Sequence, residues 1–290
     1  MNISRGLAVV ASAVLVGGPV LAGCSAEADD GRTDVVASFY PLAYVAERVA
    51  GKHADVETLT RPGTEPHDLE LTLHQIAGVA GADVVVYSRG LQAAVDDAVD
   101  QADPEHVVDA DQQARPLVGD DPHWWLDPVA VAAVAAAVSD QLTQADPAHA
   151  ADYAKNLEGF RADLEKLDRA YRQGLADCTR NTVVVSHDAF GALERYGLTT
   201  VAINGLSPDA EPSPAHLREL SGLIETKGIT TVFSEALASP ELAQTLADEL
   251  GLATAVLDPI EGLSDQTADQ DYLSLMRANL AALRKANDCR

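Results

Sequence analysis

Short runs rich in β-branched residues alternate with longer helix-forming segments along most of this chain. Strands that alternate with helices in this way pair in parallel, and helices cover both faces of the sheet. The pattern predicts strands at residues 34–39, 54–59, 82–87 and 106–110, and again at 182–186, 199–203, 230–234 and 254–258. Helices are predicted at residues 41–50, 72–80, 91–102, 189–196, 214–226, 239–250 and 270–287. We therefore expect an α/β fold of two lobes, each a mostly parallel sheet flanked by helices.

One long helix is predicted between the two series. Asp146 can cap a helix whose first residue is Pro147, and nothing interrupts the helical pattern from there to about residue 175. A helix of this length spans roughly 40 Å and joins the lobes as a rigid strut rather than a hinge. The expected domains are an N-terminal lobe at residues 34–146, the connecting helix at residues 147–177 and a C-terminal lobe at residues 178–290.

The first 33 residues have the pattern of a targeting segment and a tether. Arg5 precedes an apolar or small run up to residue 22, which is typical of a cleaved secretory signal, here residues 1–23. Residues 21–24, LAGC, resemble the lipobox of bacterial lipoproteins. That resemblance implies that Cys24 is lipidated and that residues 24–33 tether the protein outside the cytoplasmic membrane of a bacterium, at the cell surface or in the periplasm. The alternative is an ordinary signal followed by a chance cysteine.

Charge and cysteine content restrict the partners. The formal net charge is −25, so the surface repels nucleic acid and attracts cations without selectivity. We expect a monomer that binds no nucleic acid. Once Cys24 is lipidated, Cys178 and Cys289 remain, and in an oxidising compartment such a pair is expected to form a disulfide. Two separate thiols are the alternative.

Four side chains are candidates for a metal site. His187 follows a predicted strand, Asp258 ends one, His67 lies in a Pro- and Gly-rich loop that leaves one, and His123 precedes a helix starting near Pro128. Because ligands bind where the carboxyl ends of parallel strands gather, we expect the four side chains to meet between the lobes. Three imidazoles and one carboxylate suit Zn²⁺ and leave no coordination position for a catalytic water.

Further acidic residues near these positions have weaker claims. Glu65 is either an outer ligand or hydrogen-bond acceptor near His67, or an exposed residue. Glu235, at a strand end, is the reserve carboxylate for Asp258. The acids before His123 are interpreted as solvated surface: Asp109, Asp111, Asp120 and Asp121. The other five histidines are expected at the surface or as capping residues.

Six segments occur in the order found in one known family. They are PGTEPHDLELT, DPHWWLDP, VVSHDAFGALERYGL, GLSPDAEPSPAHL, VFSEALASP and LDPI. From about residue 34 to residue 290 the chain resembles the cluster A-I family of metal-binding solute-binding lipoproteins, which serve bacterial zinc and manganese ABC transporters. The resemblance implies two α/β lobes with a long connecting helix, and the metal ligands His67, His123, His187 and Asp258.

The same motifs suggest supporting residues. Asp188 and Glu211 recur in them and can orient ligands, although each can equally cap a turn or a helix. The only two tryptophans, Trp124 and Trp125, directly follow His123. We interpret them as a packing wedge at the lobe interface that fixes the angle of the His123 imidazole. A stacking platform for an organic ligand is the alternative.

The expected function is capture of Zn²⁺ outside the membrane and its delivery to an ABC permease with its cytoplasmic ATPase. Three histidines with one carboxylate favour zinc, while Mn²⁺ can bind more weakly. Loading by a metallochaperone is left open. We expect no enzyme, because a zinc hydrolase needs an open coordination position and a general base, and no HExxH signature is present. The remaining candidate functions are adhesion to a surface and the binding of a siderophore or haem.

Overall fold

Two four-stranded parallel sheets form the framework of the computed structural model, which describes residues 31–208 and 210–290. The first sheet contains β1 (Thr33–Ala37), β2 (Ala54–Thr58), β3 (Val84–Tyr87) and β4 (Val107–Asp109). The second contains β5 (Thr182–Val185), β6 (Thr199–Ala202), β7 (Thr231–Ser234) and β8 (Ala253–Val256). The spatial orders β2-β1-β3-β4 and β6-β5-β7-β8 repeat the same topology, with every neighbouring pair parallel. The predicted α/β fold of two lobes is confirmed.

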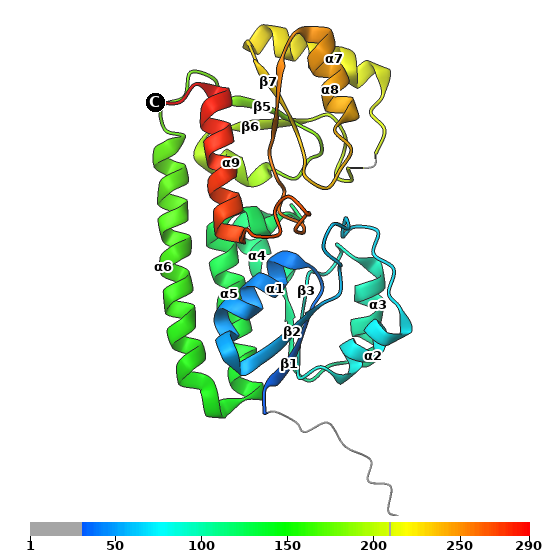
Figure 1. Cartoon of the computed structure of the whole chain (residues 1–290), viewed down its shortest axis with the longest axis vertical. Coiled ribbons are helices and arrows are strands. Elements are labelled where there is room, and N and C mark those ends of the chain that lie inside the picture. The colour runs from blue at the N-terminus through cyan, green and yellow to red at the C-terminus, as the bar shows by residue number, and fades with distance from the viewer. Residues whose placement is uncertain (1–30, 209) are drawn as a thin grey trace, which may run out of the picture. The chain divides into compact units, whose positions relative to one another are not determined.

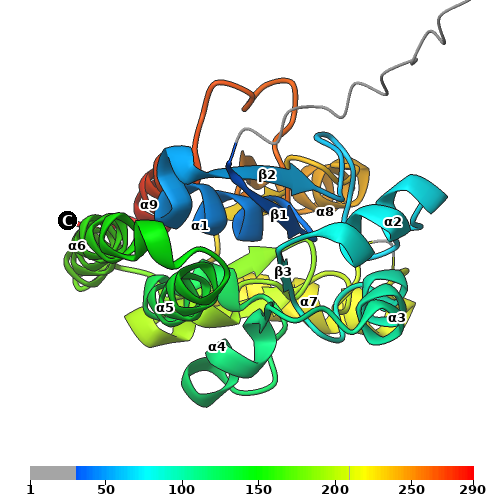
Figure 2. The same ribbon diagram turned by 90° about the horizontal axis from the view of Figure 1, so that it is seen from below.

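Helices cover each sheet on both faces (Figures 1 and 2). The first lobe has α1 (Tyr40–Ala50), α2 (Leu73–Gly81), α3 (Ala93–Ala102) and α4 (Ala110–Val118), with 3-10 turns η1 (Gly51–His53) and η2 (Trp124–Leu126). The second lobe has the 3-10 helix η4 (Gly191–Tyr196), then α7 (Pro214–Lys227), α8 (Glu241–Leu250) and α9 (Tyr272–Asn287).

Alternate residues of the central strands pack into different cores, as the period of a strand requires. Val36 of β1 packs with the buried faces of α2 and α3, whereas its neighbour Val35 packs with α1 and α5 (Pro128–Ala145). In the second sheet Val184 packs with α7 and α8, whereas Val183 and Val185 belong to the same core as Val35. The inner faces of the two lobes therefore share one hydrophobic core.

The connecting helix α6 (Ala150–Gly174) has 25 residues, which at 1.5 Å per residue gives about 37 Å. It contacts α1 and α5 of the first lobe and α9 of the second (Figure 1). The sequence pattern predicts a start at Pro147, but residues Pro147–His149 form the 3-10 turn η3 instead. There the carboxylate of Asp146 contacts the side chains of His149 and Tyr153.

Two segments differ from the sequence-based expectation. The acids before His123 are expected at the solvated surface, where Asp120 does lie, but Asp111 is buried in α4, whose N-cap Asp109 accepts a hydrogen bond from Gln112 N–H. Arg115 of α4 forms ion pairs with Asp111 and Asp120, so these acids already have a cationic partner. The predicted helix at residues 189–196 is the 3-10 helix η4 rather than an α-helix.

The predicted disulfide between Cys178 and Cys289 is present. It ties the chain just before β5 to the chain after α9, across 111 residues of sequence. Among the described residues, no helix is both long and apolar enough to span a membrane. The predicted signal at residues 1–23, the lipidated Cys24 and most of the tether lie outside the described residues.

Candidate metal centre

Three histidines and one glutamate converge where the loops of the two lobes meet. The potential ligand atoms of His67, His123, His187 and Glu261 all lie within 4.8 Å of one another. His67 lies in the loop after β2, His123 directly before η2, His187 two residues after β5, and Glu261 in the loop after β8. The structure thus brings together the three histidines singled out from the sequence, from both lobes.

One carboxylate oxygen lies near all three imidazoles. Glu261 Oε1 is 3.3 Å from His67 Nε2, 3.8 Å from His123 Nε2 and 3.5 Å from His187 Nε2. Zinc binds nitrogen and oxygen ligands at about 2.0–2.2 Å, so donors at the corners of a tetrahedron around it are about 3.4 Å apart. The three distances from Glu261 are therefore close to the donor spacing around one tetrahedral Zn²⁺.

The buried ring nitrogens support a cation at this point. Among residues 31–208 and 210–290, no group forms a hydrogen bond with Nε2 of His123 or Nε2 of His187, although both side chains are fully buried. Buried polar atoms in folded proteins nearly always have a partner, so two such nitrogens beside one another fit a cation-binding site. A metal ion that accepts both lone pairs would satisfy them.

Carboxylates behind two of the rings orient these nitrogens. His187 Nδ1 lies 2.7 Å from Glu235 Oε1, and His123 Nδ1 lies 3.0 Å from Asp121 Oδ1. Because a carboxylate can only accept, we assign the proton of each neutral ring to Nδ1, which leaves the Nε2 lone pair facing the centre. The sequence interpretation places Asp121 at the solvated surface, so its position behind His123 corrects that interpretation.

Acid-Pro-X turns place several of these residues. In the sequences EPH and DPH, the carboxylates of Glu65 and Asp121 accept hydrogen bonds from the backbone N–H of His67 and His123. Proline restricts the residue before it to extended backbone, and an acidic side chain there can close a turn on the N–H two residues later. The acid-Pro-His pattern is the sequence signal by which Asp121 could have been found.

The structure corrects the prediction that Asp258 is the fourth ligand, because Glu261 and not Asp258 lies with the three histidines. A turn of the same kind explains the difference. In the sequence DPIE, Asp258 Oδ1 accepts the backbone N–H of Ile260 at 2.8 Å, and Glu261 follows. The Asp258 carboxylate closes the turn that brings Glu261 to the site. Burial is the main reason that its pKa rises to about 6, and the nearby charges of Glu261 and Glu235 add to the increase.

The four residues expected to support the site fall into two groups. Glu235 is buried against His187, and the partly buried Glu65 bonds to the His67 backbone. Asp188 and Glu211 are both exposed. Within the described part of the chain, neither of their side chains forms a hydrogen bond or an ion pair with a histidine of the site, and the Asp188 backbone N–H donates to the carbonyl of Gly205.

The charges of the site are strongly coupled. Burial lowers the pKa of His187, but the hydrogen bond to Glu235 and the nearby charge of Glu261 outweigh it and raise the pKa to about 10. Burial raises the pKa of Glu261, yet its contacts with His187 and His67 prevail and lower it to about 2. A protonated imidazole beside an ionised carboxylate is therefore favoured, and a metal that binds here must displace the proton.

His67 marks the accessible side of the site. Its side chain is 15% exposed, whereas those of His123, His187 and Glu261 are at most 1% exposed. The loop that carries it is attached to the Glu261 loop by a backbone hydrogen bond of 2.7 Å from Gly63 N–H to Leu263 C=O.

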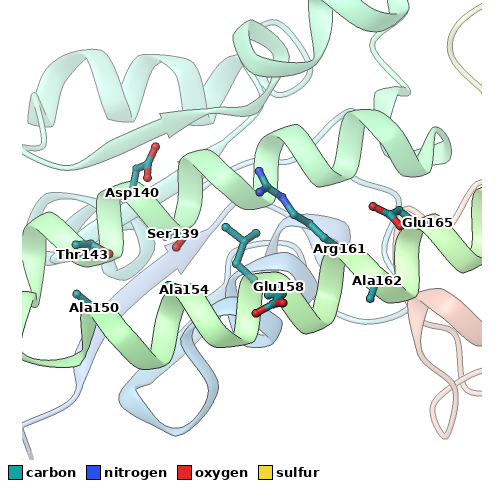
Figure 3. Close-up of a pocket in the computed structure, with 10 residues that line it drawn as sticks. Ser139, Asp140, Thr143, Ala150, Ala154, Glu158, Arg161, Ala162 and Glu165 are labelled. Carbon is teal, nitrogen blue, oxygen red and sulfur yellow. The ribbon is translucent and has the colours of Figure 1, made fainter.

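A separate groove of about 710 Å³ lies between α5 and α6, and its lining contains neither histidine nor cysteine (Figure 3).

Comparisons with known proteins agree with this geometry. Residues 35–286 match the family described as ZnuA, zinc-uptake complex component A, periplasmic. The zinc-binding lipoprotein AdcA of Streptococcus pneumoniae (strain ATCC BAA-255 / R6) is 35% identical, with 89% of this chain and 56% of AdcA covered. The high-affinity zinc uptake system protein ZnuA of Bacillus subtilis (strain 168) is 32% identical, with 90% of this chain and 89% of that protein covered.

A solved structure extends the similarity to three dimensions. The Zn(II)-bound ZnuA-like domain of Streptococcus pneumoniae AdcA matches with a TM-score of 0.77 and 36% identity, and the match covers 89% of this chain and 100% of that domain. The chain spans little more than half the length of AdcA itself.

Proposed function

Because the chain belongs to the ZnuA family of zinc-uptake proteins, we propose that it captures Zn²⁺ outside the cytoplasmic membrane and delivers it to an ABC-transporter permease. The observation that carries this proposal is the approach of three Nε2 atoms to one oxygen of Glu261, at 3.3–3.8 Å. In this role zinc is cargo, and its proposed ligands are His67, His123, His187 and Glu261.

The donor set favours zinc over manganese. Imidazole nitrogen suits Zn²⁺, whereas Mn²⁺ prefers sites with more oxygen donors and higher coordination numbers. Four donors from the protein also complete a tetrahedral shell, which supports binding and transport over hydrolysis, because a hydrolytic zinc needs an open position. Mn²⁺ is expected to bind more weakly at the same residues.

Delivery needs a way to open a closed site. We infer that the permease displaces the His67 loop, since His67 is the most exposed of the four proposed ligands and its loop is attached to the second lobe by the Gly63–Leu263 hydrogen bond. Members of this family work with a permease, and its ATPase would drive import. The lipidated Cys24, the tether, the monomeric state and any metallochaperone remain parts of the proposal that rest on the sequence alone.

A metal competition experiment tests the proposal. The purified protein is stripped of metal, exposed to equal concentrations of Zn²⁺ and Mn²⁺, desalted and analysed for both elements per chain. We expect one zinc and little manganese, and loss of that zinc in Glu261→Gln. Stoichiometric manganese would overturn the metal assignment, and retention of neither metal would overturn the site.

A further inference from the structure

Both tryptophans are fully buried, but their indole N–H groups bond in different directions. Trp124 Nε1 donates to Ser88 Oγ at 3.0 Å, within the first lobe. Trp125 Nε1 donates to the carbonyl oxygen of Pro259 at 2.7 Å, and Pro259 belongs to the turn after β8 in the second lobe. Of the two side chains, Trp125 is therefore the one whose indole hydrogen bond crosses between the lobes.

Trp125 also packs against the His123 imidazole. The two rings meet edge to face, with centroids 5.3 Å apart and an interplanar angle of 66°. On its other sides the indole meets the ring of Phe39 at 4.8 Å, and the Trp125 carbonyl accepts the hydroxyl of Tyr272 at 2.6 Å. These contacts leave the indole little freedom, so the position of Trp125 is fixed relative to His123.

Pro259 lies in a turn that is held from several directions. The side-chain amide of Asn279 accepts the Asp258 N–H at 2.9 Å and donates to the Asp258 carbonyl at 2.6 Å. Ile260 has φ of 59°, a backbone conformation that β-branched residues rarely adopt and that surrounding contacts must hold in place. The next residue is Glu261, so this turn sets where its carboxylate begins.

We propose that Trp125 is a positioning residue that fixes Glu261 relative to His123 and thereby favours zinc over manganese. Trp125 follows His123 by two residues, and Pro259 precedes Glu261 by two residues. A single buried hydrogen bond, from Trp125 to Pro259, therefore joins two ligand loops that come from opposite lobes.

The link to selectivity follows from the number of donors. With the turn fixed, Glu261 presents one oxygen, Oε1, to all three imidazoles, which gives the four donors that Zn²⁺ prefers. Mn²⁺ is favoured by extra oxygen donors, for example both oxygens of a carboxylate that is free to turn. Loosening the turn should therefore cost zinc more than manganese.

The test compares Trp125→Phe with Trp124→Phe. The first variant removes the indole donor but keeps an aromatic ring beside His123, and the second removes a similar buried hydrogen bond one residue away. Dissociation constants for Zn²⁺ and Mn²⁺ are measured on each purified protein by competition with a chelator. We expect W125F to weaken zinc binding about 10- to 100-fold, as removal of supporting contacts around a metal site typically does. Manganese binding should change much less, and W124F should leave the ratio of the two affinities unchanged.

A second variant keeps the test decisive if W125F fails to fold, as judged by circular dichroism. Tyr272→Phe keeps the buried ring but removes the hydroxyl that holds the Trp125 carbonyl. Like W125F, this variant should lower the ratio of zinc affinity to manganese affinity, but by a smaller factor. The inference would be overturned if W125F and Tyr272→Phe lowered the affinities for both metals equally, or if W124F changed the affinity ratio as much as W125F does.

Fluorescence gives a readout of position besides affinity. In W124F the remaining tryptophan is Trp125, whose emission should change when zinc binds the neighbouring His123. In W125F the remaining Trp124 bonds to Ser88 instead, and its emission should change little. The inference rests on the proposed function, and the two can fail separately. If the wild type retains no zinc, the proposed function is wrong, whereas a zinc-binding wild type with an unchanged metal ratio in the variants refutes only the role of Trp125.

Discussion

The imidazoles of His123 and His187 are each oriented by a carboxylate that contacts Nδ1, whereas that of His67 is not. The first two side chains are fully buried, and carboxylates of Asp121 and Glu235 contact their Nδ1 atoms. His67 is partly exposed, and its neighbouring acid, Glu65, bonds to its backbone N–H. One part of the site is thus pre-organised and another lies on a surface loop. The difference suggests how a site can select a metal and still release it.

Removal of a metal ligand from either part of the site should lower zinc affinity more than any other change considered below. Zinc binding worth about 10–16 kcal/mol, shared by four ligands, gives about 3–4 kcal/mol each, or roughly a hundred- to a thousandfold in affinity. We expect losses of this size in His187→Ala and in His67→Ala, measured by chelator competition. His53→Ala is the control, because His53 pairs with Asp152 away from the site. A ligand variant that binds zinc like wild type would refute the assignment.

The carboxylates behind the rings should differ from each other. Glu235→Gln removes the charge that supports the buried His187 imidazole, and we expect zinc affinity to fall about 10- to 100-fold. In Glu65→Gln the amide oxygen can still accept the His67 N–H, so the loss should be smaller than in Glu235→Gln. Titration of both variants with zinc checks the contrast, and equal losses would remove the distinction between the two parts of the site.

Affinity should rise with pH. His187, with a pKa of about 10, is protonated near neutral pH and must lose this proton to bind zinc, whereas Glu261, with a pKa of about 2, is already ionised. Between pH 6 and 8 the affinity should therefore increase up to about tenfold per pH unit for each proton released. Calorimetry in buffers with different ionisation enthalpies counts these protons. A pH-independent affinity would contradict the charge arrangement.

A smaller effect is expected from crowding Asp121. A Cβ atom added at Gly191, in the second lobe, would overlap Asp121 Oδ2, which must then move and disturb its contact with His123. Gly191→Ala should weaken zinc binding by less than the loss of Glu235, on the order of tenfold or below. Gly159→Ala is the matched control, since its added Cβ would meet no other part of the described structure within 4 Å, the neighbouring residues and backbone of its own helix apart. Equal zinc affinity in both variants would show that Asp121 does not position His123.

Loss of the disulfide should lower the stability of the protein but have the smallest effect on zinc affinity of all these changes. Cys178 and Cys289 close a loop that contains the second lobe, and loss of such a cross-link lowers the free energy of unfolding by about 2–5 kcal/mol. Denaturant unfolding of the double serine variant measures this loss. Its zinc affinity should equal that of the wild type, and a large drop in affinity would mean that the bridge also positions the ligands.

Much of the fold could be predicted because its signals are periodic. β-branched residues occur in every strand of the described residues, and the connecting helix contains no proline. Such patterns depend on neighbours in sequence. The helix α4 escapes prediction because its apolar face consists only of Ala110, Ala114 and Val118, most of its other residues are polar, and Pro116 lies inside it.

The site is harder to predict because a carboxylate that already accepts a backbone hydrogen bond within its own turn is placed away from the metal, and the sequence does not show which carboxylates do so. His67 and His187 are identified by their places after predicted strands and His123 by its place before a predicted helix, but Asp258, at a strand end, is equally suitable as the carboxylate. Its oxygen is used in its own turn, and that turn carries Glu261 to the histidines. The repeated acid-Pro-X pattern at Glu65, Asp121 and Asp258 contains this information, although only the structure shows that all three carboxylates close turns.

The central claim is that one zinc ion lies between His67, His123, His187 and Glu261. A crystal structure of the zinc-loaded protein, with anomalous data at the zinc edge, tests it most directly. The account predicts one anomalous peak about 2.0–2.2 Å from the Nε2 atoms of the three histidines and from an oxygen of Glu261. A peak bound to Asp258 in place of Glu261, or one that lies away from the three histidines, would contradict it.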